Sequence, residues 1–314
     1  MRTILLAIFL FSTWFSFTQD FKKVDSIVKE YPKTFESIIS FADKINSDFD
    51  SDIEKTRAAY YWISNNISYD YKDKESVAKR KYNKESFAND LYNIDKYKYA
   101  EKSLSSNKAI CAGYSLVLKH TLDELNIKCE VINGYAKTDI SDVGWKTNET
   151  NHAWNAVYLN DKWQLIDATW STGNEEGKPS YFNFDDSFFL IKPRDLIWSH
   201  FPKDKKWQLL DKPVSTSAFF YAPIIHTGYY NSGLELTRMQ GLIKPKENIQ
   251  IAFDTINQKN QYYYQFSEDS LNLEPITFVK EGEMYIAQIP YNKTKGKKLV
   301  IFSDYKACLS FKII

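Results

Sequence analysis

Apolar residues recur every three or four positions in the first part of the chain, which is the spacing of an amphipathic helix. The positions that define one such face are Ile53, Ala59 or Tyr60, Ile63 and Ile67. Ser51 or Asp52 can cap the start of this helix, Asn65-Asn66 can end it, and Trp62 is expected to pack in the core. Residues 21–50 have a similar spacing, with Lys and Asp on the outer faces, which predicts one or two further helices.

Another helix is predicted around the first cysteine. Its apolar face consists of Cys111, Tyr114 or Ser115, Leu118, Leu122 and Leu125. Ser105, Ser106 or Asn107 can cap this helix and Asn126 can terminate it, which places Cys111 close to the first turn. Free backbone N–H groups and the positive helix end favour a thiolate there, and they can stabilise an oxyanion. For a lone cysteine, a buried and inert thiol on an apolar helix face is the favoured interpretation.

Alternating apolar and polar residues predict a strand at 129–136 and two more at 151–159 and 162–170. The last two are separated by Asn160-Asp161, which predicts a two-residue hairpin turn.

A turn of this length fixes the register of the hairpin. Leu159 pairs with Lys162, so continued pairing would place Trp154 opposite Asp167 and His152 opposite Thr169. His152 and Asp167 then share one face as diagonal neighbours within side-chain reach. A loop with an odd number of residues would put Asp167 on the opposite face.

Cys111, His152 and Asp167 are the three groups of a thiol acyl-transfer site. The thiolate attacks a carbonyl, the imidazole takes and returns the proton, and the carboxylate orients the imidazole. Taken singly, His152 is better explained as a structural histidine and Asp167 as a turn or surface residue. Their combination with a cysteine at a helix start favours a triad.

The remaining histidines, His120, His200 and His226, are interpreted as structural or surface residues. No pair of histidines has the spacing of metal ligands, and the sequence contains no glycine-rich phosphate loop. We therefore expect neither a metal nor another cofactor.

Size and charge limit the remaining possibilities. A chain of 314 residues suggests two domains, and a formal net charge of +1 with interspersed signs argues against nucleic acid as a partner. Residues 1–19 have one basic residue, an apolar run too short to span a bilayer and a polar exit, which predicts a secretory signal peptide and a mature start near Gln19. An uncleaved anchor is the alternative. After these residues the sequence has no run that is long and apolar enough to cross a membrane.

The last third of the chain differs in character. Short alternating runs occur at 249–253, 262–266, 284–289 and 299–302, separated by polar turns, which predicts a small all-β sandwich of the immunoglobulin-like kind. Such a domain is more often a spacer or binding module than a catalyst, and its tyrosines can contact protein or glycan. The chain has an odd number of cysteines, so at least one thiol is left free. If Cys111 is the reactive one, Cys129 and Cys308 can pair with each other or can each be buried.

Four motifs together resemble the transglutaminase-like superfamily, which shares a papain-like core. They are WISNNISYD at 62–70, CAGY at 111–114, NHAWNAV at 151–157 and WQLIDATW at 163–170. Within the superfamily, the chain looks most like the branch of the kyphoscoliosis peptidase and the cytokinesis proteins. The resemblance covers about 52–210 and implies an α+β fold in which a helix bearing Cys111 packs on an antiparallel sheet bearing His152 and Asp167. Trp62 and nearby tyrosines are candidates for the oxyanion partner.

These observations predict a signal peptide at 1–19, a transglutaminase-like domain at 20–212 and a β-sandwich at 213–314. The protein is expected to be exported and to catalyse cysteine-dependent acyl transfer on a protein or peptide. Water as acceptor gives proteolysis or deamidation, and a lysine amine gives crosslinking. Hydrolysis or generic acyl transfer is favoured over calcium-dependent crosslinking, because no calcium-binding loop is visible in the sequence. The competing hypothesis is a cell-surface binding protein that keeps the fold without the chemistry.

Overall fold

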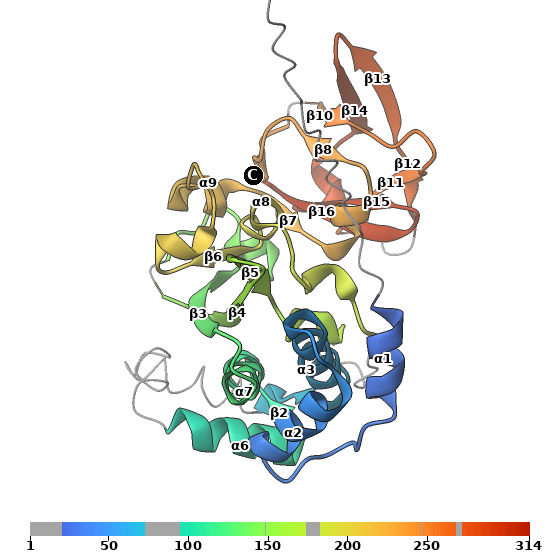
Figure 1. The fold of residues 1–314 in the computed structure, drawn as a ribbon. Coiled ribbons are helices and arrows are strands. Elements are labelled where there is room, and N and C mark those ends of the chain that lie inside the picture. Colours follow the sequence, from blue (N-terminus) through green and yellow to red (C-terminus); the bar gives the residue numbers. More distant parts are fainter. Residues whose placement is uncertain (1–20, 73–94, 148, 174–182, 246, 268–271) are drawn as a thin grey trace, which may run out of the picture.

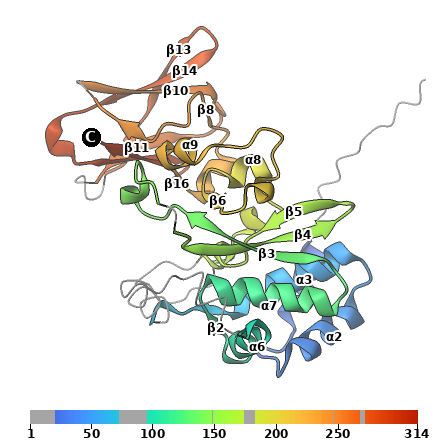
Figure 2. The same cartoon turned by 90° about the vertical axis from the view of Figure 1, so that its left-hand side faces the viewer.

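The computed structural model describes residues 21–72, 95–147, 149–173, 183–245, 247–267 and 272–314 (Figure 1). The predicted signal peptide lies outside these residues. The described chain forms a group of helices, a four-stranded antiparallel sheet packed on them, and a β-rich C-terminal part (Figures 1 and 2). This is an α+β fold followed by all-β strands, as the sequence predicts.

The helices at 22–29, 38–48, 52–66 and 111–124 agree with the predicted ones, whereas the helix at 96–106 was not predicted. They are α1 (Lys22–Lys29), α2 (Ile38–Asp48), α3 (Asp52–Asn66), α6 (Lys96–Ser106) and α7 (Cys111–Glu124). Ser51 caps α3 by accepting a hydrogen bond from the backbone N–H of Glu54, and Asn126 follows α7 with a φ of 59°. Within the described residues, no helix is both long enough and apolar enough to span a bilayer.

The predicted cap of α7 is wrong. The N-cap residue is Ile110, which has no side-chain capping bond, and the helix begins at Cys111 itself. Ser105 and Ser106 belong to α6, and Asn107 ends that helix in a left-handed conformation with a φ of 51°. Only this turn and the short strand β2 (Lys108–Ala109) separate the two helices. Cys111 is therefore placed by the chain reversal after α6.

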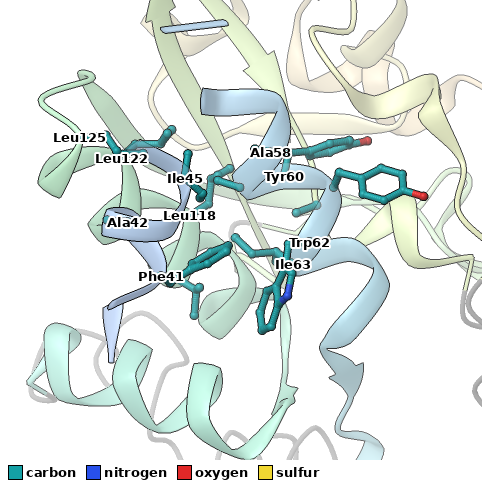
Figure 3. Close-up of a cluster of buried hydrophobic side chains, with 14 of the residues drawn as sticks. Phe41, Ala42, Ile45, Ala58, Tyr60, Trp62, Ile63, Leu118, Leu122 and Leu125 are labelled. Carbon is teal, nitrogen blue, oxygen red and sulfur yellow. The ribbon is translucent and has the colours of Figure 1, made fainter. Parts of the chain in front are cut away.

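α7 is the central helix of the first layer. It lies between the sheet and helices α2 and α6 (Figure 2), and its buried face packs on α2 and α3 through Leu118 and Leu122 (Figure 3). Trp62 is fully buried in the same core, where its indole Nε1 donates to the carbonyl of Pro32 at 2.9 Å. The core interpretation of Trp62 is thus confirmed. Because its N–H is already engaged, Trp62 is not a candidate for an oxyanion donor.

The four strands of the sheet have the order β5-β4-β3-β6. They are β3 (Cys129–Ala136), β4 (His152–Leu159), β5 (Lys162–Ile166) and β6 (His200–Pro202). The predicted register is confirmed at the turn, where Leu159 pairs with Lys162.

The continuation of that register is wrong. The last pair of the hairpin is Asn155 with Ile166, so Asp167 lies beyond the strand. The carboxylate of Asp167 accepts hydrogen bonds from the backbone N–H groups of Thr169 and Trp170, which turns the chain out of the sheet. Trp154 and His152 consequently have no strand partner on that side.

The C-terminal strands form two sheets that share one apolar core. One has the order β13-β14-β10-β8, and the other has the order β12-β11-β15-β16-β7 with β9 paired to β16. Their bounds are β7 (Ile224–Ile225), β8 (Glu235–Leu236), β9 (Leu242–Ile243), β10 (Asn248–Thr255), β11 (Tyr262–Phe266), β12 (Glu274–Pro275), β13 (Thr277–Glu281), β14 (Met284–Pro290), β15 (Lys298–Ser303) and β16 (Lys306–Ile313). The all-β prediction is confirmed, while the immunoglobulin-like detail and the domain boundaries stay predictions.

Short elements complete the described chain. They are β1 (Ser68–Tyr69), α8 (Pro193–Leu196), α9 (Thr216–Tyr221) and the 3₁₀ turns η1 (Ile140–Asp142), η2 (Trp170–Thr172), η3 (Asp186–Phe188), η4 (Lys205–Gln208), η5 (Thr227–Asn231) and η6 (Lys293–Lys295). All three cysteines are buried and unpaired. Cys129 packs in the core under α7 and Cys308 in the core of the C-terminal sheets, so the two do not form a disulfide.

A buried lysine connects the sheet to the C-terminal part. Lys137 follows β3, is 1% exposed, and donates from Nζ to the carbonyl oxygens of Phe219, Ala222 and Pro223 at 2.8–3.0 Å. Burial lowers the pKa of Lys137 to about 7, against a usual value of 10.5. The three carbonyl oxygens counteract this effect because they favour the ammonium form.

We expect Lys137 to make stability rise with pH. Above pH 7 the folded protein releases the Lys137 proton while the unfolded chain keeps it up to about pH 10.5, so the unfolded state binds more protons in this window. Urea unfolding should show that wild type gains at least about 1 kcal/mol relative to Lys137→Met between pH 7 and pH 9.5. A constant difference between the two proteins would mean that the carbonyl oxygens keep the ammonium charged.

Candidate active site

Cys111 occupies the first position of α7. Its side chain is 3% exposed and packs in a small cluster with Ile110, Ala112 and Ala153 of β4. The first backbone N–H groups of a helix have no acceptor in a preceding turn, although that of Gly113 donates to the carbonyl of Ile110 at 2.8 Å. Gly113 allows the close approach of the neighbouring segments, since a Cβ atom there would lie 2.6 Å from both the Ala109 Cβ and the Ser103 Oγ.

His152 and Asp167 form a buried pair. The His152 Nε2 lies 2.6 Å from the Asp167 Oδ2, and the two residues are 5% and 0% exposed. Because Nε2 is engaged by the carboxylate, Nδ1 is the ring nitrogen left for the thiol. The Cys111 sulfur lies close enough to this ring to contribute to the raised pKa of His152.

The electrostatics of the pair favour an imidazolium. Burial of the His152 ring opposes the charge, but the Asp167 carboxylate and the Cys111 sulfur outweigh burial and raise the pKa of His152 to about 10. Burial also opposes ionisation of Asp167, yet the charge of His152 and the hydrogen bonds of both neighbouring histidines hold the pKa of that carboxyl well below its usual range. The arrangement therefore stores a proton on the imidazole at neutral pH.

Asp167 is the most heavily hydrogen-bonded group of the site. Its Oδ1 accepts from the backbone N–H groups of Thr169 at 2.8 Å and Trp170 at 3.0 Å. Its Oδ2 accepts from the His152 Nε2 and also from the His200 Nε2, at 2.9 Å. These four bonds fix both the position and the rotation of the carboxylate.

His200 is the residue that sequence reasoning missed. The sequence indicates a structural or surface residue, whereas β6 places His200 beside Asp167, where it is 1% exposed. Burial lowers the pKa of His200 to about 4, with Asp167 opposing the shift, so this ring is neutral at pH 7. A three-residue strand that begins more than thirty positions after Asp167 gives no periodic signal, and only its pairing with β3 brings His200 into the site.

His152, Asp167 and His200 also form the set of potential metal ligands among the described residues, with ligand atoms within 4.8 Å of one another. The spacing of the histidines along the sequence did not reveal this set. Tetrahedral zinc ligands at about 2.0–2.1 Å from the ion lie roughly 3.3 Å apart, which is longer than the 2.6 Å between His152 and Asp167. The observed distances are those of charge-assisted hydrogen bonds, and a metal would have to break both of them.

Tyrosines near Cys111 differ in their role. The hydroxyl of Tyr114 donates to the carbonyl of Ile67 and is thereby engaged in the core. Tyr69 packs against the Cys111 cluster, and burial together with the charge of Cys111 raises its pKa above the usual value of 10. Among the proposed oxyanion partners, Tyr69 thus packs against the residues that surround Cys111.

The chain contains a transglutaminase-like domain. Residues 39–168 match the transglutaminase-like superfamily, and this segment includes all three residues of the predicted triad.

Individual proteins with similar sequences include a peptidase and a cytokinesis protein. The chain is 32% identical to the kyphoscoliosis peptidase of Mus musculus over 187 residues, which is 59% of this chain and 26% of the peptidase. It is 25% identical to cytokinesis protein 3 of Schizosaccharomyces pombe over 167 residues, or 53% of this chain and 19% of that protein. The chain thus spans about a quarter or less of the length of these relatives. A solved structure described as a TGase shares 20% identity over 47% of this chain and 32% of its own, with a TM-score of 0.28.

The protonation states of His152 and His200 can be measured directly. The chain has four histidines, so single substitutions suffice to assign every imidazole signal in a histidine-labelled NMR titration. We expect His152 to stay protonated up to about pH 10 because of Asp167 and Cys111, and His200 to stay neutral down to about pH 4 because of burial. An His152 that loses its proton near pH 6.5 would contradict the assigned pairing.

Proposed function

We propose that this chain is an exported, cysteine-dependent acyl-transfer enzyme that acts on carbonyl groups of proteins or peptides, with Cys111, His152 and Asp167 as its catalytic residues. The observation that supports this proposal best is the buried His152–Asp167 pair, which leaves the free imidazole nitrogen for a cysteine at a helix start. A structural histidine needs no carboxylate held by four donors. The names of several relatives, which include a peptidase, agree with this class of activity.

In the proposed mechanism the proton of Cys111 already resides on Nδ1 of the His152 imidazolium, and the thiolate of this ion pair attacks the carbonyl carbon of the substrate. The negative charge that develops on the carbonyl oxygen is stabilised by the free N–H groups at the start of α7. The C–N bond of the substrate then breaks, and the imidazolium of His152 donates its proton to the leaving nitrogen. Asp167 remains ionised throughout and keeps Nδ1 directed at the sulfur.

The thioester on Cys111 is resolved by an acceptor. Water gives a carboxylic acid and regenerates the thiol, which amounts to proteolysis or deamidation, whereas a lysine amine gives an isopeptide crosslink. We favour hydrolysis or generic acyl transfer, since the sequence has no recognisable calcium-binding loop. A C-terminal β-sandwich next to the site is suited to hold a protein substrate or a glycan.

The second candidate function is a binding protein on the cell surface that retains the fold alone. Relatives named as cytokinesis proteins favour this reading, because their names describe a cellular process and no chemistry. The two candidates differ in whether the thiol of Cys111 is activated by His152.

Alkylation by iodoacetamide distinguishes them within a single protein. We expect Cys111 to react at pH 6 at least about tenfold faster than in His152→Ala, because the imidazolium stabilises the thiolate. Cys129 and Cys308 serve as internal controls, since burial raises the pKa of both thiols, that of Cys308 to about 11. Peptide mass spectrometry reads all three sites separately.

If Cys111 is alkylated only above pH 8, and at the same rate in both proteins, the enzymatic proposal fails and the second candidate function, a binding protein, is supported. If Cys111 labels rapidly and depends on His152, peptides with and without an amine acceptor then separate hydrolysis from crosslinking. Cys111→Ala provides the baseline for that product analysis.

The proposed export is tested through the predicted signal peptide at residues 1–19. We expect a protein expressed from Met1 in a bacterial host to be recovered outside the cytoplasm with its amino terminus at or near Gln19, because residues 1–19 have the composition of a cleaved signal. Intact-mass measurement of the recovered protein gives the new terminus. A protein that keeps residues 1–18 and stays in the cytoplasm would refute export without affecting the proposed chemistry.

A further inference from the structure

Two histidines share a single oxygen of Asp167. The Nε2 atoms of His152 and His200 lie 2.6 Å and 2.9 Å from the same Oδ2. An ionised carboxylate can only accept hydrogen bonds, so both Nε2 atoms must carry a hydrogen. The sharing is therefore possible only in one protonation pattern.

The other nitrogen of His200 determines its charge. The Nδ1 lies 2.8 Å from the Ser199 Oγ. In a neutral ring with a hydrogen on Nε2, Nδ1 is an acceptor, and the hydroxyl of Ser199 donates to it. The same hydroxyl lies 3.1 Å from the carbonyl of Leu196, which would take over its hydrogen if His200 became charged.

Aromatic packing keeps this ring neutral and immobile. His200 is enclosed by Trp170, Trp154 and Phe188, with ring centroids 4.4, 5.1 and 6.0 Å away. No water is needed to satisfy the imidazole, because both nitrogens already have protein partners. Such an enclosure disfavours a charged ring and leaves a fixed, uncharged hydrogen-bond donor.

Backbone pairing fixes the donor relative to the rest of the site. His200 pairs with Ala136 and Pro202 pairs with Gly134, while Gly134 also pairs with His152 on its other side. β3 thus holds both histidines at one end of the sheet. A side chain at Gly134 would not fit, since a Cβ atom there would lie 2.4 Å from both the Phe201 carbonyl oxygen and the Trp154 ring.

We propose that His200 is a positioning residue of the active site: a neutral second histidine that holds the Oδ2 of Asp167, so that the carboxylate orients His152 toward Cys111. This inference rests on the proposed cysteine-dependent function. His200 acts through Asp167 and does not contact the reacting atoms. It also lies outside residues 39–168, the part of the chain that matches the family.

Three variants test this role. His200→Leu removes the donor, while His200→Gln keeps an N–H group that can reach Asp167. The matched control is His226→Gln, because His226 is another largely buried histidine, bonded through Nε2 to the hydroxyl of Ser310 in the C-terminal part. The readout is the rate of Cys111 alkylation by iodoacetamide from pH 5 to pH 9, together with the melting temperature of each protein.

We expect His200→Leu to slow alkylation of Cys111 at pH 6 by about tenfold, which corresponds to the loss of one hydrogen bond to a charged group. The acid limb of the rate profile should move to higher pH. His200→Gln should recover most of that rate, and His226→Gln should match wild type. If the pH profile of His200→Leu superimposes on that of wild type and only the melting temperature falls, His200 is merely structural and the proposal is wrong.

Two further outcomes keep the inference separate from the proposed function. If Cys111 is alkylated at the same rate in wild type and in His152→Ala, the proposed function itself is wrong, and the role of His200 fails with it. If His200→Leu does not fold, the imidazole NMR signals of wild type decide: an His200 that titrates near neutral pH, or that carries its hydrogen on Nδ1, overturns the proposal without any variant.

Discussion

The ionised carboxylate of Asp167 is the constraint on which the rest of the site depends. The residue is fully buried, and transferring a charge out of water costs several kcal/mol unless it is paired. Two backbone N–H groups on Oδ1 and two imidazoles on Oδ2 compensate for this cost. Removal of any one of them leaves a buried anion short of a partner. The chain around Asp167 is accordingly organised to supply donors.

This requirement explains features of the fold that propensity alone does not. β5 ends at Ile166 because the next carboxylate bonds to the backbone N–H groups of the turn that follows it. β6 is only three residues long, yet it lies in the sheet and not at the surface, since it delivers His200 to Asp167. The turn at 167–170 and the strand at 200–202 thus both supply hydrogen-bond donors to the buried carboxylate of Asp167.

Part of the site could be predicted from the sequence, because local rules determine it. The two-residue turn at Asn160-Asp161 sets the hairpin register, and that register carries His152 close to Asp167 although strand pairing stops earlier. The end of β5, the cap of α7 and the position of His200 could not be predicted. The position of His200 depends on the pairing of β6 with β3, which are distant in the chain and give no periodic signal. The end of β5 and the start of α7 are set locally, by the bonds of Asp167 to the turn that follows it and by the chain reversal after α6, and neither is visible in the apolar alternation.

The family match ends at residue 168, immediately after Asp167. Three of the four donors to this carboxylate come from outside the adjacent strand, and Thr169, Trp170 and His200 all lie beyond the matched segment. A chain cut at 168 would keep Cys111, His152 and Asp167 but would lack the groups that keep Asp167 ionised and oriented. The presence of the three residues in a relative therefore does not establish a working site. The donors that follow them must be present as well.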